Sequence, residues 1–151
     1  MYDYTPGNTP WYHGYYGGGE LIQLHSVVIE EGVTKIGDAA FNNSEELSSV
    51  TIADSVRSIG DFAFNNCPSL TSLVIPNGVT SIGEYAFCRC EQLESITIPD
   101  SVTSIGRNAF NACPQLSIEY EGSKEQWDEL RARNIEVNNE YLVNAEIIYV
   151  T

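Results

Sequence analysis

The sequence predicts a β-rich α/β solenoid, a right-handed stack of 23-residue coils with parallel strands and short helical turns, capped at both ends. The first observation that predicts it is a strict period of 23 residues. Leucine recurs at this spacing as Leu24, Leu47, Leu70, Leu93 and Leu116. A fixed period between about 20 and 50 residues is typical of solenoids and propellers, whose units are too short to enclose a core alone. Each coil must therefore pack its apolar edge on the next one.

The second observation is an alternation of apolar and polar residues at the start of each coil. In "SSVTIA", "TSLVIP" and "ESITIP" two apolar residues stand two positions apart, at the third and the fifth residue of each segment. In a strand, Val50 and Ile52 would therefore point to one side, and Ser49 and Thr51 to the other. A proline ends two of these segments, because proline cannot donate a hydrogen bond to a neighbouring strand. Each coil is expected to contain one half-buried strand.

The second half of each coil carries a glycine followed by an Ala-Phe pair. We expect the glycine to take a backbone conformation that a Cβ atom would forbid. We expect "EYAFCRC" to form a turn of helix that places Ala86 and Phe87 in the core. Identical residues of successive coils lie above one another, so a buried aromatic spine is predicted. Its members are Phe41, Phe64, Phe87 and Phe110.

The repeated unit, as in "LESITIPDSVTSIGRNAFNAC", closely resembles the BspA-like leucine-rich repeats, a bacterial class found largely in surface and secreted proteins. The resemblance runs from about Pro10 to Leu130. It implies the leucine-rich repeat solenoid predicted above. Ser55 stands where the horseshoe type of leucine-rich repeat has an asparagine, and a C-x-x-L corner, Cys67 to Leu70, precedes the strand instead. The ligand rules of the horseshoe type are therefore not carried over.

Three regions are expected along the chain: an aromatic and glycine-rich N-terminal cap at 1–23, four repeats at 24–116, and a C-terminal strand–helix–strand cap at 117–151. Ser123 and Gln126 form a capping-box pattern. It predicts a helix around Lys124–Leu130, with Trp127 and Leu130 on the face that covers the last coil. The pattern Y-x-G-[ST]-x-x-x-W also resembles the tail that follows these repeats in the family; here it is Tyr120, Gly122, Ser123 and Trp127.

The N-terminal segment lacks the basic start and the apolar stretch of a signal peptide. Its Pro-Trp pair, Pro10 and Trp11, resembles segments that precede the first repeat in such proteins, where more sequence lies upstream. By this analogy we expect Met1 to lie inside a longer natural protein.

Charge and composition exclude several classes of function. The 21 acidic residues outnumber the 7 basic ones, and the net charge is −14. Such a field repels nucleic acid and anionic membranes, which demand Lys and Arg patches. The longest apolar runs are a few residues, so we expect no membrane insertion.

No catalytic constellation is visible, so we expect no enzyme, no cofactor and no metal site. His13 and His25 are the only histidines, and nothing around them suggests a catalytic triad. The acidic pairs are neighbours in sequence, which is not how two carboxylates are held across a glycosidase cleft. The glycines of "YYGGGE" lie in the N-terminal cap and do not resemble a phosphate-binding loop.

Three of the four cysteines, Cys67, Cys90 and Cys113, occupy one column of the repeat, and Ser44 is the fourth member of that column. Serine suits a small corner residue and does not suit a metal ligand. We therefore predict buried structural thiols that lie in register and are mostly reduced. A disulfide and a metal site that includes the "CRC" of residues 88–90 are the alternatives.

The candidate binding residues come from the positions where the repeats differ. One column between the glycine and the Ala-Phe pair varies freely, and its neighbour is mostly acidic. The two columns are Ala39, Phe62, Tyr85 and Asn108, and Asp38, Asp61, Glu84 and Arg107. We expect Phe62 and Tyr85 to stack one coil apart, partly in water and flanked by Asp61 and Glu84. Trp11 and Tyr12 form a second aromatic cluster; the alternative for Phe62 and Tyr85 is that their rings only cover a corner of the core.

These observations favour a non-catalytic interaction or adhesion module with an unknown protein or glycan ligand. An extracellular or cell-surface location follows from the family resemblance alone. The alternative is a structural spacer or a self-assembling unit. A display module is expected to be a monomer, and an assembly should depend on concentration. An enzyme acting on carbohydrate is the third hypothesis, and no motif supports it.

Overall fold

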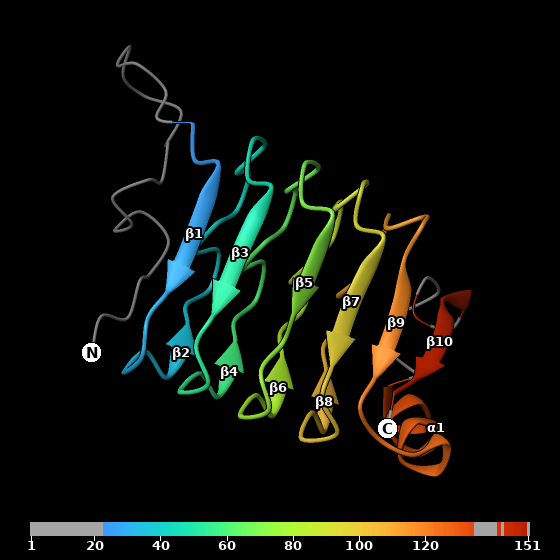
Figure 1. Ribbon diagram of the computed structural model, residues 1–151. Helices are drawn as coiled ribbons and strands as arrows, with labels where there is room; N and C mark the ends of the chain where they lie inside the picture. Colours follow the sequence, from blue (N-terminus) through green and yellow to red (C-terminus); the bar gives the residue numbers. More distant parts are fainter. Residues whose placement is uncertain (1–22, 135–141, 143, 151) are drawn as a thin grey trace.

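The structure is a computed structural model that describes residues 23–134, 142 and 144–150. Each coil contributes one longer and one shorter strand, and the coils stack side by side (Figure 1). The longer strands are β1 (Ser26–Ile29), β3 (Ser49–Ile52), β5 (Ser72–Val74) and β7 (Ser95–Ile98). The shorter ones are β2 (Lys35–Ile36), β4 (Ser58–Ile59), β6 (Ser81–Ile82) and β8 (Ser104–Ile105). After the last coil follow β9 (Ser117–Tyr120), α1 (Lys124–Asn134) and β10 (Glu146–Tyr149).

All strand pairs are parallel, and within the repeats they join equivalent residues of neighbouring coils, as Ser72 with Ser95 and Ser58 with Ser81. The pair of β7 with β9 is shifted by one residue, because Ser95 pairs with Ser117, 22 residues later. The short strands form one continuous sheet, in the order β2-β4-β6-β8. The long strands form two sheets, β1-β3 and β10-β9-β7-β5. The predicted solenoid of stacked parallel-stranded coils is confirmed, with an interruption of the large sheet between β3 and β5 that the repeat did not predict.

The alternation within the long strands is as predicted. Ile52 is buried and Val50 is half-buried, while Ser49 and Thr51 are exposed. Inward residues of the long strands and of the short strands meet in a single core that runs through all coils. Each long strand thus buries one face against this core and turns the other face outward.

The phenylalanine spine is confirmed. The rings of Phe41, Phe64, Phe87 and Phe110 stack in sequence, with centroid separations of 5.1, 5.4 and 5.5 Å and interplanar angles of 17°, 3° and 5°. All four are buried in the core. The spacing of the rings follows the spacing of the coils, so each ring covers one face of the next.

The turn that carries the Ala-Phe pair is not helical. Its amides bond alternately: Ala39 donates to the Asp61 carbonyl of the next coil at 2.7 Å, whereas Ala40 donates to the Gly37 carbonyl three residues back at 3.2 Å. The alternation continues through Asn43 and recurs in the second and third coils. Two residues in each turn have φ between 54° and 61°. They are Ala39, Asn43, Phe62, Asn66, Tyr85, Arg89, Asn108 and Ala112. In a helix every amide donates to a carbonyl of the same segment. In these turns every second amide donates to a carbonyl of the next coil instead.

The role predicted for the repeated glycine was wrong. Among the described glycines only Gly32 has a positive φ, of 97°. Gly83 is required for another reason: a Cβ atom there would lie 2.5 Å from the carbonyl carbon of Gly60 and 2.6 Å from the amide nitrogen of Asp61. The glycine therefore permits close approach between coils, and the left-handed conformation falls two residues later.

The C-terminal helix begins at its predicted capping box. The Ser123 amide donates to Gln126 Oε1 at 2.7 Å, and the Gln126 amide donates to Ser123 Oγ at 3.2 Å. Trp127 and Leu130 are buried, and the Trp127 ring lies 5.0 Å from that of Tyr120 in β9. The helix therefore covers the last coil as predicted and continues four residues further, to Asn134.

The three cysteines of the repeated column lie in register, as predicted. Each thiol donates a hydrogen bond to a phenylalanine carbonyl of the preceding coil, at 3.3 Å for Cys67, 3.2 Å for Cys90 and 3.1 Å for Cys113. All four cysteines, including Cys88, are buried free thiols. Burial raises the pKa of Cys67 and of Cys113 to about 12, and it raises the pKa of Cys90 further.

The thiols should be protected from alkylation in the folded protein. Iodoacetamide near pH 8 is expected to modify none of the four cysteines rapidly in the native state and all four after unfolding, because only the thiolate reacts. A thiol with an ordinary pKa of 9.0 when unfolded and a pKa of about 12 when folded favours the folded state while it stays protonated. Stability should therefore fall as pH rises from about 9 towards about 12, measured by urea unfolding at several pH values.

The matched control is Cys67→Ser, because Ser44 already occupies this column in the first coil. In this variant the free energy of unfolding should fall less between about pH 9 and about pH 12 than it does in the unchanged protein. A native intact mass that rises by about two hydrogens per pair on reduction would show disulfides and contradict the prediction.

Candidate interaction surface

Phe62 and Tyr85 occupy a backbone position that does not favour aromatic residues. Ala39, Phe62, Tyr85 and Asn108 hold it in successive coils with φ between 54° and 57°. The left-handed region costs most L-residues about 1–2 kcal/mol, and asparagine and glycine tolerate it best. Asn108 is therefore the residue that the backbone would favour here, and the two aromatic side chains need another explanation.

The two rings form a parallel stack on the surface, here called the aromatic ridge. Their centroids are 4.9 Å apart and their planes differ by 4°. Phe62 is 41% exposed, Tyr85 is half-buried, and Asn108 Nδ2 donates to the Tyr85 hydroxyl at 3.0 Å. Neither ring belongs to the hydrophobic core cluster. The predicted stacking in partial contact with water is confirmed.

The acidic residues beside the aromatic ridge have a structural role that the sequence did not reveal. The Asp61 amide donates to Asp38 Oδ1 at 3.1 Å, and the Glu84 amide donates to Asp61 Oδ1 at 2.8 Å. Both carboxylates thus join successive coils. Their side chains and that of Glu84 are nevertheless exposed, so they add negative charge to this surface.

A shallow groove runs along the small sheet next to these acids. Its volume is about 470 Å³. Its lining includes three glycines, which leave room because they have no side chains, together with Lys35, Asp38, Asp61 and Glu84. We call it the small-sheet groove. Sequence reasoning missed it, although the column of glycines directly after the short strands was a signal for it.

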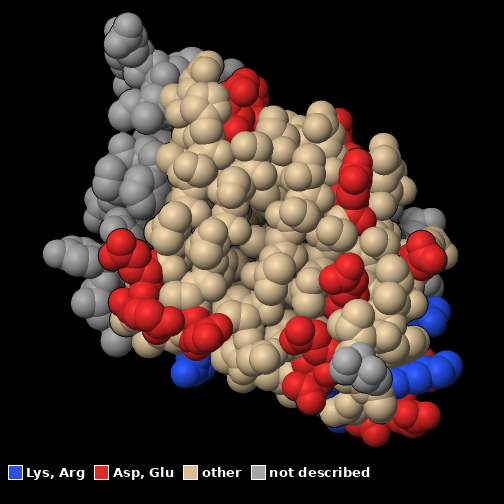
Figure 2. Space-filling view, in the orientation of Figure 1, with Lys and Arg blue, Asp and Glu red and all other residues tan. Residues whose placement is uncertain are grey.

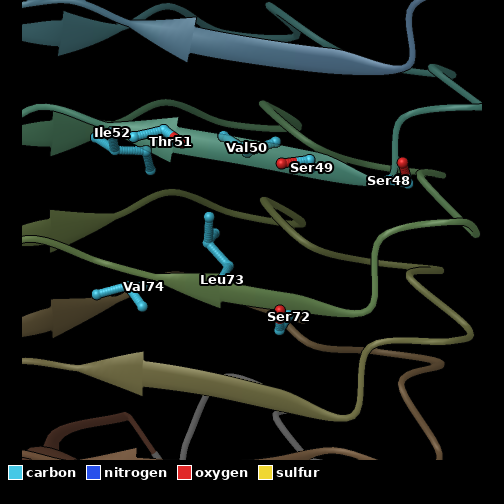
Figure 3. Close-up of a pocket in the computed structure, with 8 residues that line it drawn as sticks. All are labelled: Ser48, Ser49, Val50, Thr51, Ile52, Ser72, Leu73 and Val74. Atoms are coloured by element: carbon cyan, nitrogen blue, oxygen red, sulfur yellow. The ribbon is translucent and has the colours of Figure 1, made fainter.

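The large sheet presents a second and different surface. Its outer face carries the exposed Val28 and Val74, at 68% and 65%, among serines and threonines. Figure 2 shows this broad face without charged side chains at its centre and with acidic residues along its margins. A hollow of about 270 Å³ lies where the sheet is interrupted, with Ser49 and Thr51 of β3 on one side and Ser72 of β5 on the other (Figure 3).

The second predicted aromatic cluster, in the N-terminal segment, is not tested by the described part of the chain. Trp11, Tyr12 and His13 lie outside the described residues, and His25 is exposed. Within 23–134, 142 and 144–150, no three His, Cys, Asp or Glu side chains are grouped so that they could hold a metal ion. Over the same residues, no helix is long and apolar enough to cross a membrane.

Residues 19–130 match the BspA type leucine rich repeat region, in six copies. The chain belongs to the BspA type leucine rich repeat family. The matched range contains every strand from β1 to β9 and all four phenylalanines of the spine. No curated protein matches the sequence.

Solved bacterial structures agree with this family. A leucine rich repeat protein of T. pallidum is 33% identical with a TM-score of 0.62, over 64% of this chain and 45% of that one. One from Bacteroides ovatus is 29% identical with a TM-score of 0.66, over 85% and 30%. A leucine rich cell surface protein from Faecalibacterium prausnitzii is 31% identical with a TM-score of 0.64, over 77% and 35%. The chain therefore spans less than half the length of each of these proteins.

Proposed function

We propose that this chain is a non-catalytic interaction or adhesion module of a bacterial surface or secreted protein, and that its ligand is a protein or a glycan. The family consists of leucine rich repeats, and one similar structure is named a cell surface protein. The observation that carries the proposal is the aromatic ridge. An extracellular location rests on the family and on this neighbour.

The aromatic ridge has the properties of a binding anchor. Its two large rings stay largely out of the core, so folding gains less from them than from the phenylalanine spine. The left-handed backbone under Phe62 and Tyr85 disfavours them. Stacking holds both rings in one orientation, which lowers the entropy lost on binding. Exposed aromatic residues with a polar rim are typical of partner sites.

Replacing both rings by asparagine tests the proposal. In Phe62→Asn with Tyr85→Asn, we expect the free energy of unfolding to change by less than about 1 kcal/mol, because surface side chains are removed and asparagine suits the backbone. Attachment to a partner identified on glycan and extracellular-protein arrays should fall. Urea unfolding and surface plasmon resonance measure the two effects.

Val74→Ser is the matched control, since Val74 is exposed on the large sheet, away from the aromatic ridge. It should leave binding unchanged. If the control alone reduces binding, the large sheet is the site. A loss of several kcal/mol in the double variant with binding intact would make the rings structural and remove this proposal.

A second candidate function, self-assembly, has one observation in its favour. Among the described strands β10 is the last of its sheet, and Ile148 and Tyr149 of this strand, together with Val150 after it, are exposed. Such an edge offers unpaired backbone groups to another strand. Sedimentation velocity over a hundredfold concentration range separates the two functions, because a display module remains a monomer and an assembly grows.

A further inference from the structure

The stack of the aromatic ridge stops one coil short of the N-terminal end. One face of the Phe62 ring is covered by Tyr85, and the next position along the column is Ala39, which offers only a methyl group. The backbone has the same arrangement at each position of this column, because three equivalent amides each donate a hydrogen bond to a carbonyl of the following coil. They are Ala39 to Asp61 at 2.7 Å, Phe62 to Glu84 at 2.8 Å and Tyr85 to Arg107 at 2.9 Å.

The space over Ala39 suits a flat group. The rings of Phe62 and Tyr85 are separated by 4.9 Å, which is the step from one coil to the next. A planar group placed one step further would stack on the open face of Phe62, at the carbon–carbon separation of about 3.5–4.0 Å that favours dispersion. The 41% exposure of Phe62 agrees with an uncovered ring face.

The charges around this space select a cation. Asp38 directly precedes Ala39, and Asp61 directly precedes Phe62, so an exposed carboxylate lies beside each of the two positions. The chain as a whole carries a net charge of −14, which attracts basic partners from solution. Arginine alone among cationic side chains is planar, stacks on aromatic faces and pairs with carboxylates through two hydrogen bonds.

We propose that the open face of Phe62 receives an arginine side chain from a basic segment of a partner protein. The guanidinium stacks on Phe62 above Ala39 and pairs with Asp38 and Asp61. The small-sheet groove, with Glu84 further along, takes the neighbouring part of the same segment. This inference rests on the proposed interaction function and names the chemistry of its partner.

Lys35 provides an internal test of this inference. Its Nζ atom lies 3.9 Å from Asp38 Oδ1, and both side chains are about half exposed, at 49% and 51%. Lys35 is therefore a loosely held cation that competes for the same carboxylate. The equivalent positions in the other coils are the serines Ser58, Ser81 and Ser104. Lys35→Ser thus removes the competitor and restores the residue that the repeat uses elsewhere.

The probe is a fluorescein-labelled peptide of alternating arginine and glycine, with lysine and glutamate versions as controls, followed by anisotropy at low ionic strength. We expect the arginine peptide to bind more tightly than the lysine peptide. Phe62→Asn should weaken arginine-peptide binding by about fivefold. Asp38→Asn, which keeps Oδ1 as an acceptor for the Asp61 amide, should also weaken it, and Lys35→Ser should strengthen it.

Glu91→Gln is the matched control for Asp38→Asn, because it removes one exposed negative charge outside both the aromatic ridge and the small-sheet groove. Equal binding of both basic peptides, with Glu91→Gln as harmful as Asp38→Asn, would show unspecific attraction and overturn the inference. Circular dichroism and urea midpoints verify that each variant is folded.

The two proposals fail in different ways. If an identified partner depends on Phe62 and Tyr85 but is a neutral glycan, unaffected by Lys35→Ser or by salt, the proposed function stands and the arginine site is overturned. If the arginine peptide binds as expected while that partner ignores the double asparagine variant, the arginine site stands and the ridge is not the anchor for that partner.

Discussion

Phe87→Ala is expected to lower the free energy of unfolding by about 3–5 kcal/mol. The side chain is fully buried, and its ring lies between those of Phe64 and Phe110, at 5.4 and 5.5 Å. Its removal uncovers a ring face on each side and leaves a cavity in the middle of the stack. The backbone cannot close that cavity, because the amides of Tyr85, Phe87 and Arg89 are bonded to the next coil, at 2.8 Å for Phe87 to Ala109.

Urea unfolding of the two variants Phe87→Ala and Phe62→Ala measures this effect against its control. Phe62 is also a phenylalanine and lies two positions before the spine residue Phe64, but its side chain is exposed. Phe62→Ala should therefore lower the free energy of unfolding by less than about 1 kcal/mol. Similar losses in the two variants would show that the spine does not dominate the stability of the coil stack.

Gly83→Ala adds a single methyl group and should lower the free energy of unfolding by about 3 kcal/mol, because it overpacks the contact between two coils. The added Cβ atom would lie 2.5 Å from backbone of Gly60 and 2.6 Å from that of Asp61. Relief requires the coils to separate locally. That separation stretches the bond from the Gly83 amide to the Ile59 carbonyl, now 2.9 Å, and the bond from the Glu84 amide to Asp61 Oδ1.

Thermal and urea unfolding test this expectation, with Ser81→Ala as the control on the same short strand. Ser81 is half-buried and its column consists of small or flexible residues, so this variant should be nearly neutral. If Gly83→Ala is as stable as the control, the coils yield easily at this point and the glycine column has another purpose.

The candidate surface could be predicted in part. Because the period of 23 residues places equivalent residues above one another, the sequence by itself determined that Phe62 lies next to Tyr85 and that Asp61 lies next to Glu84. It also determined the phenylalanine spine, the cysteine column and the capped helix at Ser123, since these depend on register or on local chemistry.

Only the tertiary structure decided the direction of each peptide group and the spaces between coils. Whether the turn after Gly37 is helical depends on carbonyl groups of the next coil, which accept every second amide and leave Ala39 and its equivalents left-handed. The interruption between β3 and β5, and the small-sheet groove, are likewise absent from the repeat pattern. The repeat period predicts which residues are neighbours in successive coils. The directions of the hydrogen bonds and the gaps between coils depend on all the contacts that two folded coils make with each other.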